Sequence, residues 1–139
     1  MTNQTTVFIV EDDEEFAQLM RMRLEGLGYR VFATTNGDEA YDLIRDKLPD
    51  LVILDIFLPD MDGLTILKRL KSAIDIESGK TSLTKDIPVI IITGKAPMIE
   101  NMTRIEGASD FFVKPVHVER LISRVSQLVE LSKHDREAK

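Results

Sequence analysis

The chain has 139 residues, a length that fits one domain with a core of its own. It contains no cysteine, which excludes a disulfide framework, a thiolate metal site and a cysteine nucleophile. Its 24 acidic and 18 basic residues give a net charge of −6, a poor match to the phosphates of a nucleic acid. The first residues lack the pattern of a secretory signal, and every apolar run is too short to span a membrane, so we expect a cytoplasmic protein.

Short apolar runs alternate with amphipathic segments along the chain. Residues 7–10 and 51–54 are continuously apolar, which is typical of strands buried on both faces. Gly28 and Pro49 mark the ends of the first two helical segments. The expected strands are 7–10, 29–35, 51–54, 87–92 and 111–113, and the expected helices are 16–27, 36–48, 64–76, 97–107 and 118–131.

This order of elements is a strand–helix unit repeated about five times. It predicts an α/β fold with a five-stranded parallel sheet covered by helices on both faces, a flavodoxin-like doubly wound (βα)5 arrangement with strand order 2-1-3-4-5. The polar residues 75–86 are expected to form an extended surface loop. We expect one domain over residues 1–132, followed by a charged C-terminal tail at 133–139.

Polar side chains follow the strands at the points where the strands end. Glu11 and Asp12 come directly after the first expected strand, and Asp55 comes directly after the third. Thr93 and Lys114 follow the fourth and fifth strands. Because the carboxyl ends of parallel strands share one edge of a sheet, and order 2-1-3-4-5 makes the first and third strands neighbours, the three carboxylates are expected to meet.

Three carboxylates in one crevice repel one another unless a cation lies among them. Carboxylates, main-chain carbonyls and water are the ligands that Mg²⁺ prefers, and a bound metal would let an anionic phosphate approach. Asp55 can then act as a nucleophile and form an acyl phosphate. Lys114 supplies positive charge, and Thr93 a hydroxyl donor, for the phosphoryl oxygens. The residues therefore predict phosphoryl transfer onto Asp55.

The same positions resemble the motifs of the response-regulator receiver domain of two-component signalling. The resemblance extends from about residue 7 to residue 131, and its specificity comes from four motifs in the right order and spacing. These are residues 10–13, residues 49–55 with Pro59 and Gly63, residues 92–94, and residues 107–115.

The resemblance implies a role for each site residue. Asp55 would be the phosphoacceptor, Lys114 and Thr93 would contact the phosphoryl group, and Thr93 with Phe111 would form a switch pair. Mg²⁺ would be held by Glu11, Asp12, Asp55 and the main-chain carbonyl of Phe57. The Lys114-Pro115 peptide bond would be cis. The output face would comprise the fourth helix, the fifth strand and the fifth helix.

The resemblance also implies partners and an output. A sensor histidine kinase or a histidine phosphotransfer protein would supply the phosphoryl group, and an output protein that the sequence does not identify would bind the switched face. No direct contact with nucleic acid or a membrane is expected, and a phosphorylation-dependent dimer is left open. The chain would be a signalling domain rather than an enzyme, with self-phosphorylation and self-dephosphorylation at Asp55 as its only reactions. No effector domain is expected after the fifth helix.

Three features depart from the usual pattern of the family. Glu11 stands where aspartate is more usual, and Phe111 stands where tyrosine is also frequent. The connection at residues 75–86 is longer than expected, and the sequence assigns it no role.

Three other functions compete with this interpretation. A haloacid-dehalogenase-like phosphatase would need a second aspartate two residues after the nucleophile, where this chain has Phe57. A flavodoxin-like cofactor binder would need a hydroxyl- and glycine-rich loop where the acidic residues 11–13 stand. An unphosphorylated adaptor of the same fold is disfavoured by the complete set of site residues, and the sequence alone does not decide against it.

Overall fold

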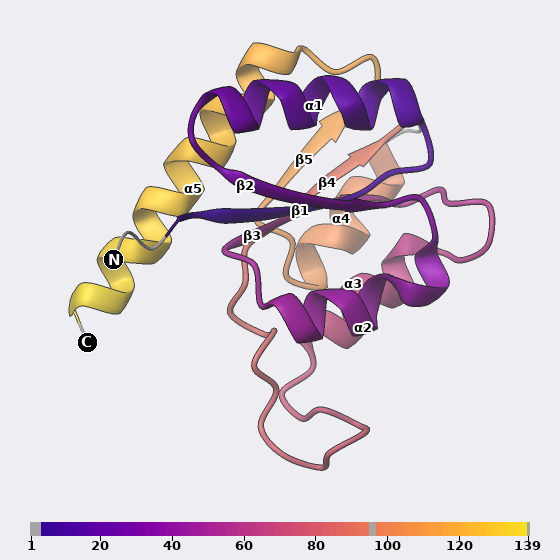
Figure 1. Cartoon of the computed structure of the whole chain (residues 1–139). Coiled ribbons are helices and arrows are strands. Elements are labelled where there is room, and N and C mark those ends of the chain that lie inside the picture. Colours follow the sequence, from indigo (N-terminus) through magenta and orange to yellow (C-terminus); the bar gives the residue numbers. More distant parts are fainter. Residues whose placement is uncertain (1–3, 95–96, 139) are drawn as a thin grey trace.

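The computed structural model describes residues 4–94 and 97–138, which form alternating strands and helices (Figure 1). The strands are β1 (Thr6–Val10), β2 (Arg30–Thr34), β3 (Leu51–Asp55), β4 (Val89–Thr93) and β5 (Asp110–Val113). The helices are α1 (Glu14–Gly26), α2 (Gly37–Lys47), α3 (Gly63–Lys71), α4 (Pro97–Ile105) and α5 (Val118–Ala138).

The five strands form one parallel sheet in the order β2-β1-β3-β4-β5. This order confirms the predicted flavodoxin-like topology. Every residue of β3 and β4 is buried, as the continuous apolar runs predicted. The register pairs Val10 with Leu54, and Asp55 with Ile92, so the carboxyl ends of the three central strands lie along one edge of the sheet.

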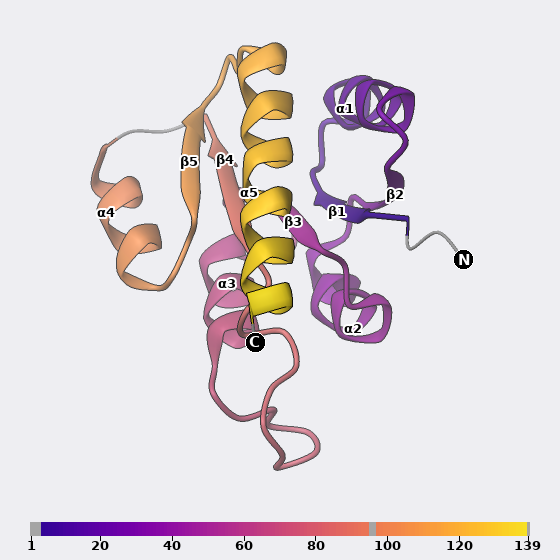
Figure 2. The same cartoon turned by 90° about the vertical axis from the view of Figure 1, so that its left-hand side faces the viewer.

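Helices cover both faces of the sheet because the strand side chains alternate between two apolar cores. Phe8 and Val10 of β1 point into a core that includes side chains of α2 and α3. Val7 and Ile9 point the other way, into a core that includes side chains of α1 and α5. Figure 2 shows α4 beside β5, on the same side of the sheet as α3.

Side-chain caps lie where the loops at the carboxyl edge of the sheet enter α1, α2 and α3. Asp13 accepts a hydrogen bond from the Phe16 amide and begins α1, as its acidic run suggested. Asn36 and Asp62 cap α2 and α3 in the same way. Each cap satisfies an amide that the first turn of its helix leaves without an intrahelical partner. The caps therefore fix where α1, α2 and α3 begin after β1, β2 and β3.

The connection between α3 and β4 differs from the prediction. Helix α3 ends at Lys71 rather than near Ile76, and Ile74 is 56% exposed instead of facing the sheet. The chain turns because Ile74 and Thr81 pair as an antiparallel bridge, and the Asp75 amide donates to the Lys80 carbonyl. We call residues 73–82 the α3–β4 hairpin; Figure 1 shows it projecting below α2 and α3.

The last helix is also longer than predicted. Helix α5 continues to Ala138 rather than ending near Leu131. Residues 132–138 include neither glycine nor proline, so no helix-breaking residue ends the helix earlier. Within the described ranges 4–94 and 97–138, no helix is both long and apolar enough to cross a membrane.

Candidate functional site

Asp55 is the last residue of β3, and its side chain is enclosed at the carboxyl edge of the sheet. The residue is only 2% exposed. Its Oδ1 accepts a hydrogen bond of 3.0 Å from the Phe57 amide, and its Oδ2 accepts one of 3.0 Å from Lys114 Nζ. Gly63, at the end of the loop that follows β3, lies close to the backbone of Asp55 and Ile56. A Cβ atom at Gly63 would come within 2.7 Å of the Ile56 Cα. The absence of a side chain at Gly63 therefore lets the loop close tightly behind Asp55.

Two further acids come from the end of β1, the neighbouring strand. Glu11 is completely buried, and its amide continues the sheet by donating to the Thr34 carbonyl at 3.1 Å. Asp12, the next residue, is exposed. Carboxylate oxygens of Glu11, Asp12 and Asp55 all lie within 4.8 Å of one another. The structure thus brings together the three carboxylates that the sequence predicted to meet.

Lys114 places its ammonium between two of these acids. Nζ donates to Glu11 Oε1 at 2.8 Å and to Asp55 Oδ2 at 3.0 Å, while the side chain remains 27% exposed. The Lys114 amide donates to the carbonyl of Thr93 at 2.7 Å, which joins the ends of β4 and β5. Thr93 is completely buried. The peptide bond between Lys114 and Pro115 is cis, which confirms that expectation.

The electrostatics of the site are those of a crowded anionic pocket with one ammonium. Burial raises the pKa of Glu11 to about 7; the nearby Asp55 charge adds to this rise, while hydrogen bonds from Lys114 and Asp13 oppose it. Burial also opposes the charged form of Lys114, but its hydrogen bonds to Glu11 and Asp55 outweigh that cost and raise its pKa. The lysine therefore stays charged. Its single positive charge lies beside a cluster of three carboxyl groups, those of Glu11, Asp12 and Asp55.

The carboxylate oxygens of Glu11, Asp12 and Asp55 are ligands that suit a divalent cation with a preference for oxygen. Glu11 Oε2 is buried, and no group in the described residues donates a hydrogen bond to it. An orphaned carboxylate oxygen is costly unless it meets a cation or an ordered water. The cluster offers carboxylates only, which suits Mg²⁺ or Ca²⁺ better than zinc. The acidic cluster could therefore hold a metal ion.

Comparison with known proteins agrees with this arrangement. The family model described as "Response regulator receiver domain" matches residues 7–126. The chain belongs to this receiver-domain family. It is similar to the response regulator MprA of Mycobacterium sp. (strain KMS), with 31% identity over 130 residues that cover 93% of this chain and 52% of that protein. The receiver domain described here thus spans about half the length of that curated relative.

Solved structures show the same family likeness. The signal receiver domain of a DNA-binding response regulator from Colwellia psychrerythraea 34H is similar, with a TM-score of 0.80 and 33% identity over 91% of this chain and 99% of that one. The BeF3-activated N-terminal receiver domain of Klebsiella pneumoniae RstA has a TM-score of 0.72 and 28% identity, and the match covers 90% of this chain and 98% of that one. The receiver domain is thus a signalling module of two-component systems.

The remaining predicted positions lie around this centre. Phe57 lies two positions after Asp55 and is 45% exposed. Phe111 is half-buried on β5 and packs against the core beneath α2 and α3. Asp60, which the sequence analysis did not single out, accepts hydrogen bonds from the first amides of α2. Only its place in the turn-rich loop after β3 could have drawn attention to it.

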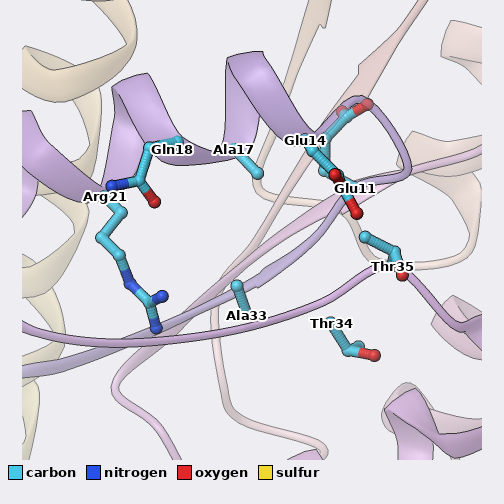
Figure 3. A pocket seen from close by; sticks show the side chains of 8 residues that line it. All are labelled: Glu11, Glu14, Ala17, Gln18, Arg21, Ala33, Thr34 and Thr35. Atoms are coloured by element: carbon cyan, nitrogen blue, oxygen red, sulfur yellow. The ribbon is translucent and has the colours of Figure 1, made fainter.

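A cleft of about 570 Å³ adjoins the site on the side of β2 (Figure 3). Glu11 stands at one end of it, and Arg21 of α1 reaches across to donate to the Val31 carbonyl at 3.0 Å. Neither Asp55 nor Lys114 lines this cleft. It is therefore a neighbour of the carboxylate cluster, not part of it.

Proposed function

We propose that this receiver domain takes a phosphoryl group onto Asp55 from a sensor histidine kinase or a histidine phosphotransfer protein. The single observation that carries the proposal is the buried Asp55 carboxylate. It forms an ion pair with Lys114 Nζ at 3.0 Å and belongs to the carboxylate cluster that also contains Glu11 and Asp12. A nucleophilic carboxylate, a fixed ammonium and a set of oxygen ligands are the parts that phosphoryl transfer onto an acid requires.

In the reaction, an Oδ atom of Asp55 attacks the phosphorus of a phosphohistidine. The new O–P bond forms as the N–P bond breaks, and the imidazole leaves with the bonding electron pair and takes up a proton. Lys114 faces the Asp55 carboxylate and supplies positive charge to the phosphoryl oxygens, and Thr93 supplies a hydroxyl. Glu11, Asp12, Asp55 and the Phe57 carbonyl would hold Mg²⁺, which when bound neutralises charge on the phosphate and the carboxylates.

The phosphorylated state would then favour a second conformation. Thr93 is buried at the end of β4, and Phe111 is half-buried on the neighbouring strand β5, where Ile91 is its partner in the register. A shift of Thr93 toward the phosphoryl group would make room for the Phe111 ring to turn inward. The face formed by α4, β5 and α5 would change with it, and so would its affinity for an output protein in the cytoplasm.

The test is to incubate the receiver domain with acetyl phosphate and Mg²⁺ and to weigh the intact protein. We expect one added phosphoryl group on the wild type, none on Asp55→Asn, and none when the divalent cation is removed with a chelator. Equal phosphorylation of the wild type and Asp55→Asn would place the acceptor elsewhere. No added mass on the wild type would favour an adaptor that works without phosphorylation.

A further inference from the structure

The loop after β3 is attached to the amino end of α2 through Asp60. Asp60 Oδ1 accepts a hydrogen bond of 3.1 Å from the Gly37 amide, and Oδ2 accepts one of 3.0 Å from the Asp38 amide. These amides belong to the first turn of α2, where no intrahelical carbonyl is available. The hydrogen bonds from Asp38 and Gly37 lower the pKa of Asp60, so the carboxylate remains charged at neutral pH.

The same loop is closed at its base, beside the phosphoacceptor. Phe57 and Asp62 pair as an antiparallel bridge, and the Gly63 amide donates to the Ile56 carbonyl at 2.8 Å. Residues 57–62 therefore form a narrow loop with Asp55 at its base and Asp60 near its tip. Asp60 therefore links the tip of this loop to the first turn of α2 through two hydrogen bonds from main-chain amides.

Gly37 shows how closely the two parts approach. A Cβ atom at this position would lie 3.0 Å from Met61 Cβ, 3.1 Å from Asp60 Oδ1 and 3.1 Å from Leu58 Cδ1. Three loop side chains thus rest against the first residue of α2. A methyl group at position 37 would crowd these loop side chains, which would have to move by a few tenths of an ångström, while leaving the Asp60 charge in place.

We propose that Asp60 is a positioning residue, which holds the loop at 57–62 against α2 so that the Phe57 carbonyl is kept in place for the metal ion beside Asp55. The inference rests on the proposed function, because Phe57 is assigned as a ligand there. A loop carbonyl binds a cation well only when its position is fixed beforehand, since ordering it during binding costs conformational entropy. Fixing the loop tip therefore increases metal affinity without adding a ligand.

Asn36 provides a matched control because it shares a donor with Asp60. Its Oδ1 accepts from the same Asp38 amide at 2.9 Å, but Asn36 lies on the α2 side and holds no part of the loop. Asp60→Ala and Asn36→Ala each remove one cap from the same helix end. Only Asp60→Ala also releases the loop.

The experiment measures the Mg²⁺ dissociation constant of the full chain by isothermal titration, together with the thermal midpoint of each variant. We expect Asp60→Ala to raise the dissociation constant by roughly threefold or more, and Asn36→Ala to leave it nearly unchanged. Gly37→Ala keeps every charge, so an increase in this variant as well would show that loop position, not the loss of a negative charge, weakens binding. Asp60→Asn, which retains one acceptor oxygen, should recover part of the affinity.

Two results would overturn the inference. The first is an Asp60→Ala dissociation constant no higher than that of Asn36→Ala at similar thermal midpoints. The second is an Asp60→Asn dissociation constant as high as that of Asp60→Ala, because the retained acceptor oxygen would then contribute nothing. Failure of the wild type itself to bind Mg²⁺ would be a separate outcome, which refutes the metal requirement of the proposed function and the positioning role with it.

Discussion

The receiver domain buries carboxylates in two regions, and the two regions treat them in opposite ways. At the carboxyl edge of the sheet, Glu11 is completely buried, one of its oxygens has no hydrogen-bond partner among the described residues, and its pKa is raised to about 7. In the α3–β4 hairpin, Asp75 is 7% exposed, yet its pKa is lowered.

The difference lies in the donors that surround each acid. Burial alone would raise the pKa of Asp75, but hydrogen bonds from Ser78 Oγ at 2.9 Å and the Glu77 amide at 3.3 Å, together with the charge of Arg45, lower it. Arg45 Nη2 lies 2.6 Å from Asp75 Oδ2, and the Tyr41 hydroxyl donates at 3.3 Å. A paired buried acid stabilises a fold, whereas an incompletely paired one is free to serve a ligand.

The largest effect is expected when the paired acid is removed. Asp75→Ala leaves Arg45, Tyr41 and Ser78 without their shared acceptor, so we expect the thermal midpoint to fall by roughly 5 °C or more. Differential scanning calorimetry measures this. Glu77→Ala, in the same hairpin but with a side chain 49% exposed, is the control and should change the midpoint little.

Asp75→Ala should nevertheless leave phosphorylation intact. The hairpin leads into the amino end of β4, whereas Asp55 lies at the carboxyl end of β3 (Figure 1). If Asp75→Ala accepted far less phosphoryl group than the wild type at a temperature where both are folded, the two regions would be coupled. The contrast between a structural acid and a functional acid would then fail.

A smaller effect, with the opposite sign, is expected at Glu11. Its pKa in the folded protein lies above the usual value of 4.5, so the folded state binds more protons than the unfolded state between about pH 4.5 and pH 7. Without divalent cations, this contribution to stability is complete below about pH 4.5 and is lost as the pH rises through 7. At pH 8 we therefore expect Glu11→Gln to be more stable than the wild type by about 1 kcal/mol.

Urea unfolding of the wild type and Glu11→Gln at pH 5.5 and pH 8, both with a chelator, measures this difference. The advantage of the variant should shrink at the lower pH, where the wild-type acid gains a proton. A variant that is less stable than the wild type at pH 8 would mean that the bond from Lys114 fully offsets the burial of the Glu11 charge.

The regions also differ in how well the sequence predicted them. Glu11 and Lys114 directly follow β1 and β5, and Asp55 and Thr93 are the last residues of β3 and β4. The strand order alone was therefore enough to bring these four residues together. That inference needs only local apolar patterns and the geometry of a parallel sheet.

The hairpin could not be found in that way. The pairing of Asp75 depends on Tyr41 and Arg45 of α2, which lie 34 and 30 positions earlier in the chain. No local pattern reports such a pairing, and the helical spacing of residues 64–76 suggested a longer α3. Asp60 escaped notice for the same reason, because its acceptor role appears only when the loop meets α2.

The most direct test of the central claim is an Mg²⁺ titration followed by amide NMR at neutral pH. The claim is that Glu11 and Asp12 at the end of β1, and not the paired Asp75 in the hairpin, form the cation site beside Asp55. We predict saturable shifts at residues 10–13 and 55–58, weakened in Asp55→Asn, and no comparable shifts at residues 73–82. Absence of saturable shifts at the strand ends, or equal shifts in the α3–β4 hairpin, would contradict the account.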